Sequence, residues 1–206
     1  MNTDEEIFIT NSFEKTQKLG KGFAESLAVR SLLNEGDSLA KIIALYGDLG
    51  SGKTTFVQGL AEGLGIKRRV ISPTFVFIRQ YQVYSLREQS SSRNNVIPAK
   101  AGIQIPDPNF ARLRWARQVG NDKISSRQAR TIYFYHIDLY RIENKRHLEG
   151  LGIEEIIKNP ENIVAIEWAE KMGGLLPRKR WDVKFEYLSE NKRRVTIEKL
   201  EARNPK

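Results

Sequence analysis

The stretch GDLGSGKTTF, residues 47–56, holds three glycines, a lysine and two threonines within ten positions. Four residues separate Gly47 from Gly52-Lys53-Thr54, which fits the pattern G-x-x-x-x-G-K-[ST] of a phosphate-binding loop. Glycine allows backbone angles that other residues avoid, so a ligand can approach the main chain closely. Such a loop offers its N–H groups, a lysine charge and a hydroxyl to phosphate oxygens and Mg²⁺. The alternative is a glycine-rich turn before an ordinary helix.

The residues on both sides of this stretch favour the binding loop. Ile42 to Leu45 form an apolar run that predicts a buried strand of a parallel sheet, within a segment that ends at Tyr46. After the loop, five apolar positions between residues 54 and 64 fall on one helical stripe, and Gly63 and Gly65 signal the end of the helix. The five positions are Phe56, Val57, Leu60, Ala61 and Leu64. Strand, loop and helix therefore follow in the order that the motif requires.

Length and composition limit the remaining possibilities. A chain of 206 residues is long enough for one domain with a core, and we expect a single domain over residues 1–206. The sequence has no cysteine, which excludes disulfides, cysteine-ligated zinc and thiol catalysis. The start MNTDEEIFIT lacks the features of a secretory signal, and no run of 18 apolar residues occurs. We therefore expect a cytoplasmic protein without a membrane segment.

The formal charge of +9 is concentrated in one segment. Residues 85–130 hold nine Lys or Arg against three Asp or Glu, a net charge of +6, which leaves +3 for the other 160 residues. The same segment holds three of the seven prolines and shows no periodicity, so we expect a basic, disordered insertion. The alternative is a basic arm that binds RNA, with Phe110 and Trp115 stacking on bases.

The rest of the chain alternates helical and strand patterns, which indicates an α/β protein. The predicted helices cover residues 12–33, capped by Asn11 or Ser12, residues 54–64 and residues 148–157. The predicted strands cover residues 39–46, 75–81, 131–140 and 163–166, followed by a hairpin around residues 183–187 and 195–197.

Two acids follow apolar strands and are placed to complete a hydrolytic site. Hydrolysis requires, besides the loop, a carboxylate for the metal's water shell and a group that orients the attacking water. Glu167 follows the apolar run 163–166, and Asp138 ends the preceding β-prone segment. Both acids should therefore lie at the carboxyl ends of strands, where open α/β sheets bind ligands. The alternatives are a surface acid for Glu167 and a turn or capping aspartate for Asp138.

Two further residues are candidates for the site. His136 stands two residues before Asp138, and Thr74 follows the helix predicted after the loop. A lone histidine in an aromatic strand is more often packed and hydrogen-bonded than catalytic, so we expect His136 to be structural. Thr74, in Ser72-Pro-Thr-Phe75, occupies a place where some nucleotide hydrolases carry a threonine that senses the γ-phosphate. A proline turn before a strand accounts for it equally well.

Taken together, GDLGSGKTTF, SPTF, HIDLYRI, LEGLGIEE and IVAIEWAEKMGGLLP resemble, in this order, the bacterial TsaE family of tRNA threonylcarbamoyladenosine biosynthesis ATPases, formerly YjeE. The resemblance covers nearly the whole chain outside residues 85–130, where family members usually have a short turn. It implies a three-layer fold of the P-loop NTPase type, with a mainly parallel sheet flanked by helices and a C-terminal β-hairpin extension. It also implies a weak Mg²⁺-dependent ATPase that docks on TsaB and TsaD and resets that complex, reaching tRNA only through it.

The same resemblance assigns roles to residues in the matching motifs. Lys53, Glu167 and Asp138 would act in catalysis. Mg²⁺ would be held by Thr54, Glu167 and Asp138. The residues expected to contact ATP or ADP are Asp48, Leu49, Gly50, Ser51, Gly52, Lys53, Thr54, Thr55, Thr74, Trp168 and Phe13.

Other functional classes share some of these features. A small-molecule or nucleotide kinase also has a phosphate-binding loop, but it needs an acceptor pocket and an arginine-rich lid, which residues 85–130 could imitate. A GTPase is disfavoured because the guanine-reading motif Asn-Lys-x-Asp does not occur. A basic RNA-binding module predicts salt-sensitive tRNA binding that is abolished by deleting residues 85–130.

Overall fold

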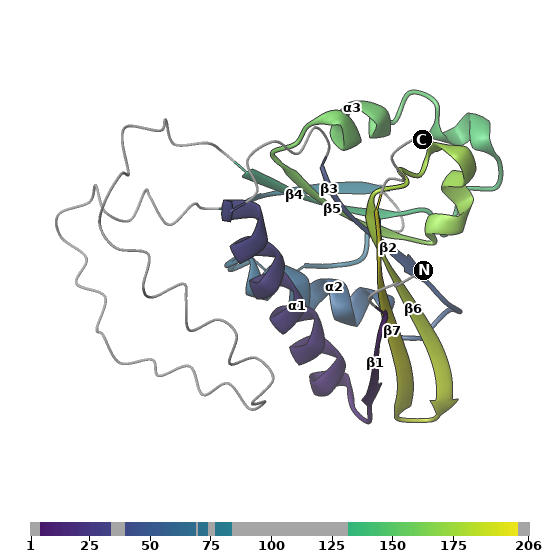
Figure 1. Ribbon diagram of the computed structural model, residues 1–206. Coiled ribbons are helices and arrows are strands. Elements are labelled where there is room, and N and C mark those ends of the chain that lie inside the picture. Colours follow the sequence, from purple (N-terminus) through teal and green to yellow (C-terminus); the bar gives the residue numbers. More distant parts are fainter. Residues whose placement is uncertain (1–4, 34–39, 69, 74–76, 84–131, 202–206) are drawn as a thin grey trace, which may run out of the picture. The chain divides into compact units, whose positions relative to one another are not determined.

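The computed structural model describes residues 5–33, 40–68, 70–73, 77–83 and 132–201 (Figure 1). All of these residues belong to one compact unit, formed by Met1–Tyr84 and Thr131–Lys206. The predicted insertion, residues 85–130, lies outside the described residues, as does Thr74.

The described residues form a seven-stranded sheet in the order β1-β7-β6-β2-β5-β4-β3. The strands are β1 (Glu5–Thr10), β2 (Lys41–Tyr46), β3 (Ile78–Val83), β4 (Ile132–Asp138), β5 (Asn162–Glu167), β6 (Arg180–Ser189) and β7 (Lys192–Leu200). The four central strands, β6, β2, β5 and β4, are parallel to one another. The outer pairs β1–β7, β6–β7 and β3–β4 are antiparallel. The sheet is thus parallel at its centre, where the predicted site lies, and antiparallel toward both edges.

Helices cover both faces of the sheet (Figure 1). The helices are α1 (Phe13–Leu33), α2 (Lys53–Gly63) and α3 (Ile153–Lys158), with the 3-10 segments η3 (Lys145–Leu148) and η4 (Ala169–Leu175). Successive residues of β2 alternate between two cores, because Ile43 and Leu45 pack with α1 and α2 whereas Ile42 and Ala44 pack with α3 and η4. This burial on both faces explains the continuous apolar runs of β2 and β5.

Two glycines allow α1 and α2 to cross at very close range. A Cβ atom on Gly20 would collide with the carbonyl oxygen of Phe56, and one on Gly59 would collide with the carbonyl oxygen of Gln17. Because a side chain cannot fit at either place, the close crossing depends on glycine. The crossing fixes α2, and with it the loop before α2, against the sheet.

Most predicted elements are confirmed, with two exceptions. The helix predicted over residues 148–157 is present but starts later, because Gly150 and Gly152 take positive φ angles of 83° and 68° and helix α3 begins only at Ile153. Strand β1 was not predicted; it pairs with β7, and Phe8 packs against the core of α1 and α2.

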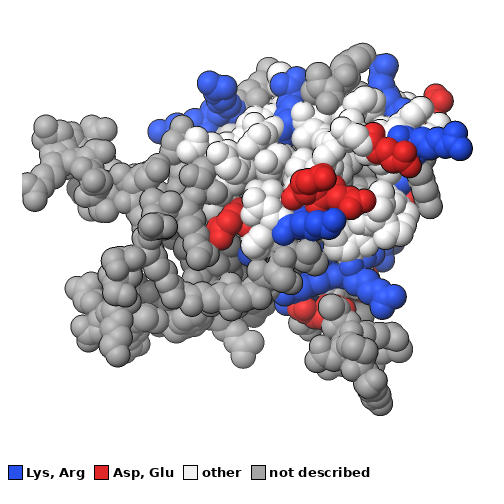
Figure 2. Space-filling view, turned by 90° about the horizontal axis from the view of Figure 1, so that it is seen from above, with Lys and Arg blue, Asp and Glu red and all other residues white. Residues whose placement is uncertain are grey.

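Charges of both signs lie side by side on the face shown in Figure 2, over the part of the chain that the structure describes. Among these residues, no helix combines the length and apolar character that a membrane crossing needs.

Candidate functional site: a loop, a helix start and two strand ends

The loop between β2 and α2 owes its shape to glycines. Gly47, Gly50 and Gly52 have φ angles of 132°, 76° and 106°, a region that other residues rarely adopt. A Cβ atom on Gly47 would also lie 2.5 Å from the carbonyl oxygen of Phe185 in β6. Helix α2 starts directly after Gly52, with no side-chain cap and no acid in its first turn. Its N-terminal N–H groups and the positive end of its dipole are therefore left for an anion.

Lys53, the first residue of α2, folds back over this loop. Its side chain is buried, and Nζ donates hydrogen bonds to the carbonyl oxygens of Gly47 at 2.6 Å and Asp48 at 2.8 Å. The same atom lies 4.0 Å from the ring centre of Trp168. Burial lowers the pKa of Lys53, and nearby carboxylates, Glu167 most strongly, oppose this shift. The lysine charge is therefore held at the loop by carbonyl dipoles and an aromatic face.

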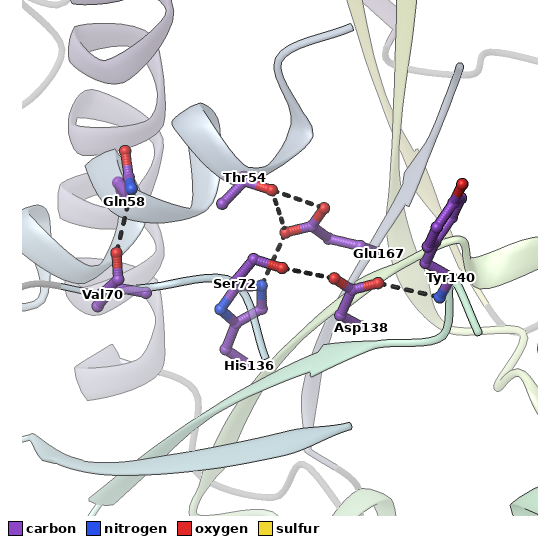
Figure 3. Close-up of polar contacts among 8 residues, drawn as sticks. All are labelled: Thr54, Gln58, Val70, Ser72, His136, Asp138, Tyr140 and Glu167. Atoms are coloured by element: carbon purple, nitrogen blue, oxygen red, sulfur yellow. Dashed lines mark hydrogen bonds and ion pairs between the residues drawn. The ribbon is translucent and has the colours of Figure 1, made fainter. Parts of the chain in front are cut away.

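Glu167, the last residue of β5, meets the start of α2. Thr54 Oγ1 lies 2.9 Å from both Oε1 and Oε2 of Glu167, so the threonine hydroxyl donates to this carboxylate (Figure 3). On the other side, His136 Nε2 lies 2.8 Å from Glu167 Oε1. Glu167 is 3% exposed, so its charge is screened little by solvent. A hydroxyl next to a buried carboxylate at a helix start suits a hard, oxygen-binding cation.

Asp138, the last residue of β4, is the register partner of Glu167 on the neighbouring strand. Its carboxylate accepts a hydrogen bond from Ser72 Oγ at 2.6 Å and another from the Tyr140 N–H at 3.0 Å (Figure 3). Asp138 is also buried, with 3% exposure. It thereby ties the segment before β3 to the turn after β4.

Trp168 and Tyr140 follow the two acids and pack against each other. Their ring centres are 5.2 Å apart, and Trp168 adopts a left-handed backbone conformation with φ 59°. Lys171 donates hydrogen bonds from Nζ to the carbonyl oxygens of Tyr140 and Ile142, the latter at 2.9 Å. Because these bonds join η4 to the chain after β4, they fix the two aromatic rings at the site.

These elements enclose a cleft of about 360 Å³. It is lined by Leu49, Gly50, Ser51, Gly52, Lys53, Thr54, Thr55, Ser72, Asp138, Tyr140, Glu167 and Trp168. Ser51 Oγ is buried and has no hydrogen-bond partner among the described residues. A buried hydroxyl without a partner is costly, so this atom suits a ligand with oxygen acceptors.

The structure brings most of the predicted site residues to this cleft. Asp48 contributes its carbonyl oxygen to Lys53 but does not line the cleft. Phe13, at the start of α1, is 55% exposed and is not among the lining residues. Ser72 and Tyr140 line the cleft and were not predicted as site residues. Their positions within SPTF and DLYR were the available signal, but the direction of their side chains could be assigned only from the structure.

In this site a glycine-rich loop joins the central strand β2 to helix α2, and an acid ends β5, the neighbour of β2 in the sheet. This arrangement is typical of nucleotide-binding α/β proteins. The family model described as threonylcarbamoyl adenosine biosynthesis protein TsaE matches residues 10–90 and 123–195. Because these stretches make up more than half of the chain, the protein belongs to the TsaE family. Residues 91–122, between the two stretches, are not matched.

Individual relatives agree with the family model. The tRNA threonylcarbamoyladenosine biosynthesis protein TsaE of Bacillus subtilis is 28% identical over 173 residues, covering 84% of this chain and 78% of that protein. The protein of the same name from Haemophilus influenzae is 29% identical over 170 residues, covering 82% and 75%. The crystal structure of YdiB from Bacillus subtilis has a TM-score of 0.57 at 21% identity and covers 98% of this chain and 89% of that one. This last similarity supports the α/β fold.

Proposed function

We propose that this protein binds ATP with Mg²⁺ in the cleft and hydrolyses it, as the ATPase subunit of tRNA threonylcarbamoyladenosine synthesis. The observation that carries the proposal is the contact of Thr54 Oγ1 with both carboxylate oxygens of Glu167, at 2.9 Å each. This contact joins the helix after the loop to the end of a central strand. Nucleotide hydrolases hold their metal ion in this way, by a loop hydroxyl and a strand-end acid.

The residues of the cleft fit a magnesium nucleotide. Magnesium is usually bound by one or two protein oxygens together with phosphates and waters rather than by a cage of protein ligands. The described residues contain no group of three or more His, Asp or Glu side chains that could form such a cage. Ser51 Oγ and the N–H groups at the start of α2 supply donors for phosphate oxygens.

Within this proposal, each residue of the chain has a defined task. Lys53 would exchange the carbonyl oxygens of Gly47 and Asp48 for phosphate oxygens. Thr54 would turn a lone pair of its hydroxyl oxygen to the metal while its O–H still donates a hydrogen bond to Glu167, and Glu167 would orient the attacking water. Mg²⁺, when bound, neutralises charge on the transferred phosphoryl group. Asp138 would support hydrolysis by holding Ser72 and the Tyr140 N–H at the rim of the cleft. The proposal that Asp138 also holds the metal is tested below.

The names of the relatives support the pathway part of the proposal. We propose that the protein acts in the cytoplasm with TsaB and TsaD, using ATP binding and hydrolysis to reset their complex, and that it reaches tRNA only through them. We also propose that residues 1–206 form one domain interrupted by the insertion 85–130. The gap in the family match at residues 91–122 supports this last point.

Phosphate release from ATP tests the enzymatic part. With Mg²⁺ we expect slow release of inorganic phosphate, and none in EDTA. The assay should be repeated with a panel of nucleoside and sugar acceptors, because phosphate transfer to any of them would favour a kinase instead.

Co-purification tests the pathway part. Tagged protein should retain TsaB and TsaD in a manner that depends on ATP, and its depletion should lower threonylcarbamoyladenosine in tRNA, as measured by mass spectrometry. An unchanged nucleoside content would contradict the proposed pathway.

A further inference from the structure

His136 is the most deeply buried polar residue beside the cleft. It lies on β4, its relative exposure is 0%, and it is not among the residues that line the cleft. In the sheet register it pairs with Ala165 of β5, two residues before Glu167. Because side chains two residues apart in a strand share a face, His136, Asp138 and Glu167 all project toward α2. The small methyl group of Ala165 leaves the imidazole room to reach along β5 to the carboxylate.

The contact between His136 and Glu167 fixes which imidazole nitrogen is the donor. A carboxylate accepts hydrogen bonds and donates none, so Nε2, at 2.8 Å from Oε1, carries the hydrogen. The other ring nitrogen, Nδ1, has no hydrogen-bond partner among the described residues. Within the part of the chain that the structure describes, the only polar contact of this buried ring is therefore the one with Glu167 (Figure 3).

The carboxylate of Glu167 is consequently held from two sides. The single proton of the Thr54 hydroxyl is shared between Oε1 and Oε2, which leaves the rotation of the carboxylate loosely defined. The bond from His136 goes to Oε1 alone and fixes this rotation. Neighbours that orient a metal-binding or water-orienting acid typically matter almost as much as the acid itself.

We propose that His136 is a positioning residue that orients Glu167 for a magnesium nucleotide. The inference rests on the proposed function of the cleft. His136 touches neither the nucleotide nor the metal; it acts through Glu167. The loss of the His136 side chain should therefore reduce the factor by which Mg²⁺ tightens nucleotide binding. The contacts between the loop and phosphate that form without metal should stay unchanged.

The test is the affinity of the full-length protein for a fluorescent ATP analogue, measured in Mg²⁺ and in EDTA. The quantity of interest is the factor by which Mg²⁺ tightens binding. We expect His136→Leu to reduce this factor, with the magnesium concentration needed for half of the effect rising about 10-fold or more. The affinity in EDTA should stay at the wild-type value. His136→Gln, whose amide carries an N–H donor at a similar distance from the main chain, should restore most of the magnesium effect.

His147 provides the matched control, because it is the only other histidine of the chain and is exposed. His147→Leu should leave both affinities unchanged. Thermal unfolding should accompany each variant, and if His136→Leu does not fold, His136→Asn takes its place, since its shorter amide cannot reach Glu167 from the same backbone position. In a Glu167→Gln background, His136→Leu should add little further loss, because coupled residues are not additive.

Three results separate this inference from the proposed function. A wild-type protein that binds the analogue with a magnesium effect, together with a His136→Leu variant that keeps the whole effect, would overturn the role of His136 alone. If the wild-type protein does not bind the analogue, or binds it with the same affinity in Mg²⁺ and in EDTA, the proposed function is overturned and this inference with it. Equal weakening in Mg²⁺ and EDTA would also overturn the role of His136, because it would show general damage to the cleft.

Discussion

The ends of β5 and β4 carry two acids that are equal in position and different in their partners. Glu167 and Asp138 are paired in register on adjacent parallel strands, and each is 3% exposed. Yet Glu167 receives hydrogen bonds from Thr54 and His136, whereas Asp138 receives them from Ser72 and the Tyr140 N–H. The comparison shows that the strand determines the position of the acid, while the hydrogen-bond partners from the surrounding elements determine its role.

The largest effect is expected from Glu167→Gln. The variant keeps the shape of the side chain and an acceptor for Thr54 but removes the charge that would act on the metal and the attacking water. We expect the rate of phosphate release to fall about 100-fold or more, while the affinity for ATP falls less in Mg²⁺, where its metal contact is weakened, and stays unchanged in EDTA. Single-turnover kinetics and equilibrium binding measure the two quantities separately. Equal losses of rate and affinity would contradict the separate roles assigned to Glu167 in hydrolysis and to the loop in phosphate binding.

Lys53→Ala should affect affinity instead. The charge of Lys53 interacts with both Glu167 and Asp138, so its effect is not limited to one of the two strand ends. Loss of a charged hydrogen bond to phosphate is worth about 1.5–3 kcal/mol, which corresponds to about 10- to 100-fold weaker ATP binding. Lys41→Ala, at the other end of β2, is the control and should bind ATP normally. Unchanged affinity in Lys53→Ala would contradict phosphate binding by the loop.

Asp138→Asn and Ser72→Ala together sharpen the comparison of the two acids. Asparagine keeps one acceptor for the Tyr140 N–H but presents an NH₂ donor to Ser72, whereas Ser72→Ala removes the hydroxyl, so both variants lose the hydrogen bond from Ser72 to a carboxylate. We expect each to slow hydrolysis about 10-fold and to lower the free energy of unfolding by about 1–2 kcal/mol. Because Asp138 is proposed also to hold the metal, the magnesium concentration for half-maximal rate should rise in Asp138→Asn and stay unchanged in Ser72→Ala. An unchanged concentration in both variants would limit Asp138 to its contacts with Ser72 and the Tyr140 N–H.

The smallest effect is expected from a change that touches neither strand end. Val83 at the end of β3 pairs with Ile132 at the start of β4, so a short turn can join these strands in place of residues 85–130. The shortened protein should bind ATP with unchanged affinity. Loss of ATP binding would show that the insertion belongs to the site, and loss of tRNA binding by the isolated protein would favour the RNA-binding alternative.

The fold around the cleft was largely predictable because its signals are local. The apolar run of β2, the glycines of the loop and the stripe of α2 identify their elements without knowledge of the rest of the chain. Strand β1 was overlooked although Ile7, Phe8 and Ile9 are β-prone, and its pairing with β7 at the far end of the sequence had no local signal. The break before α3 had a local signal in Gly150 and Gly152, because glycine is unfavourable inside a helix, and the prediction overlooked it.

The partners of the site residues were less predictable than their positions. The sequence indicated that Glu167 and Asp138 end strands, but only the register brings Asp138 beside Glu167 and directs the ring of His136 at the same carboxylate. In the same way, Ser72 reaches Asp138 across 66 positions of sequence. Contacts of this kind depend on how strands align, which no local pattern encodes.

A crystal structure of the protein with a non-hydrolysable ATP analogue and Mn²⁺ tests the central claim most directly, because the anomalous signal of manganese locates the metal. We predict one peak at coordination distance from Thr54 Oγ1, with Glu167 holding the metal directly or through a bound water and the phosphates against the N–H groups of residues 50–55. A peak beside Asp138 and away from Thr54, or a nucleotide bound outside the cleft, would contradict the account.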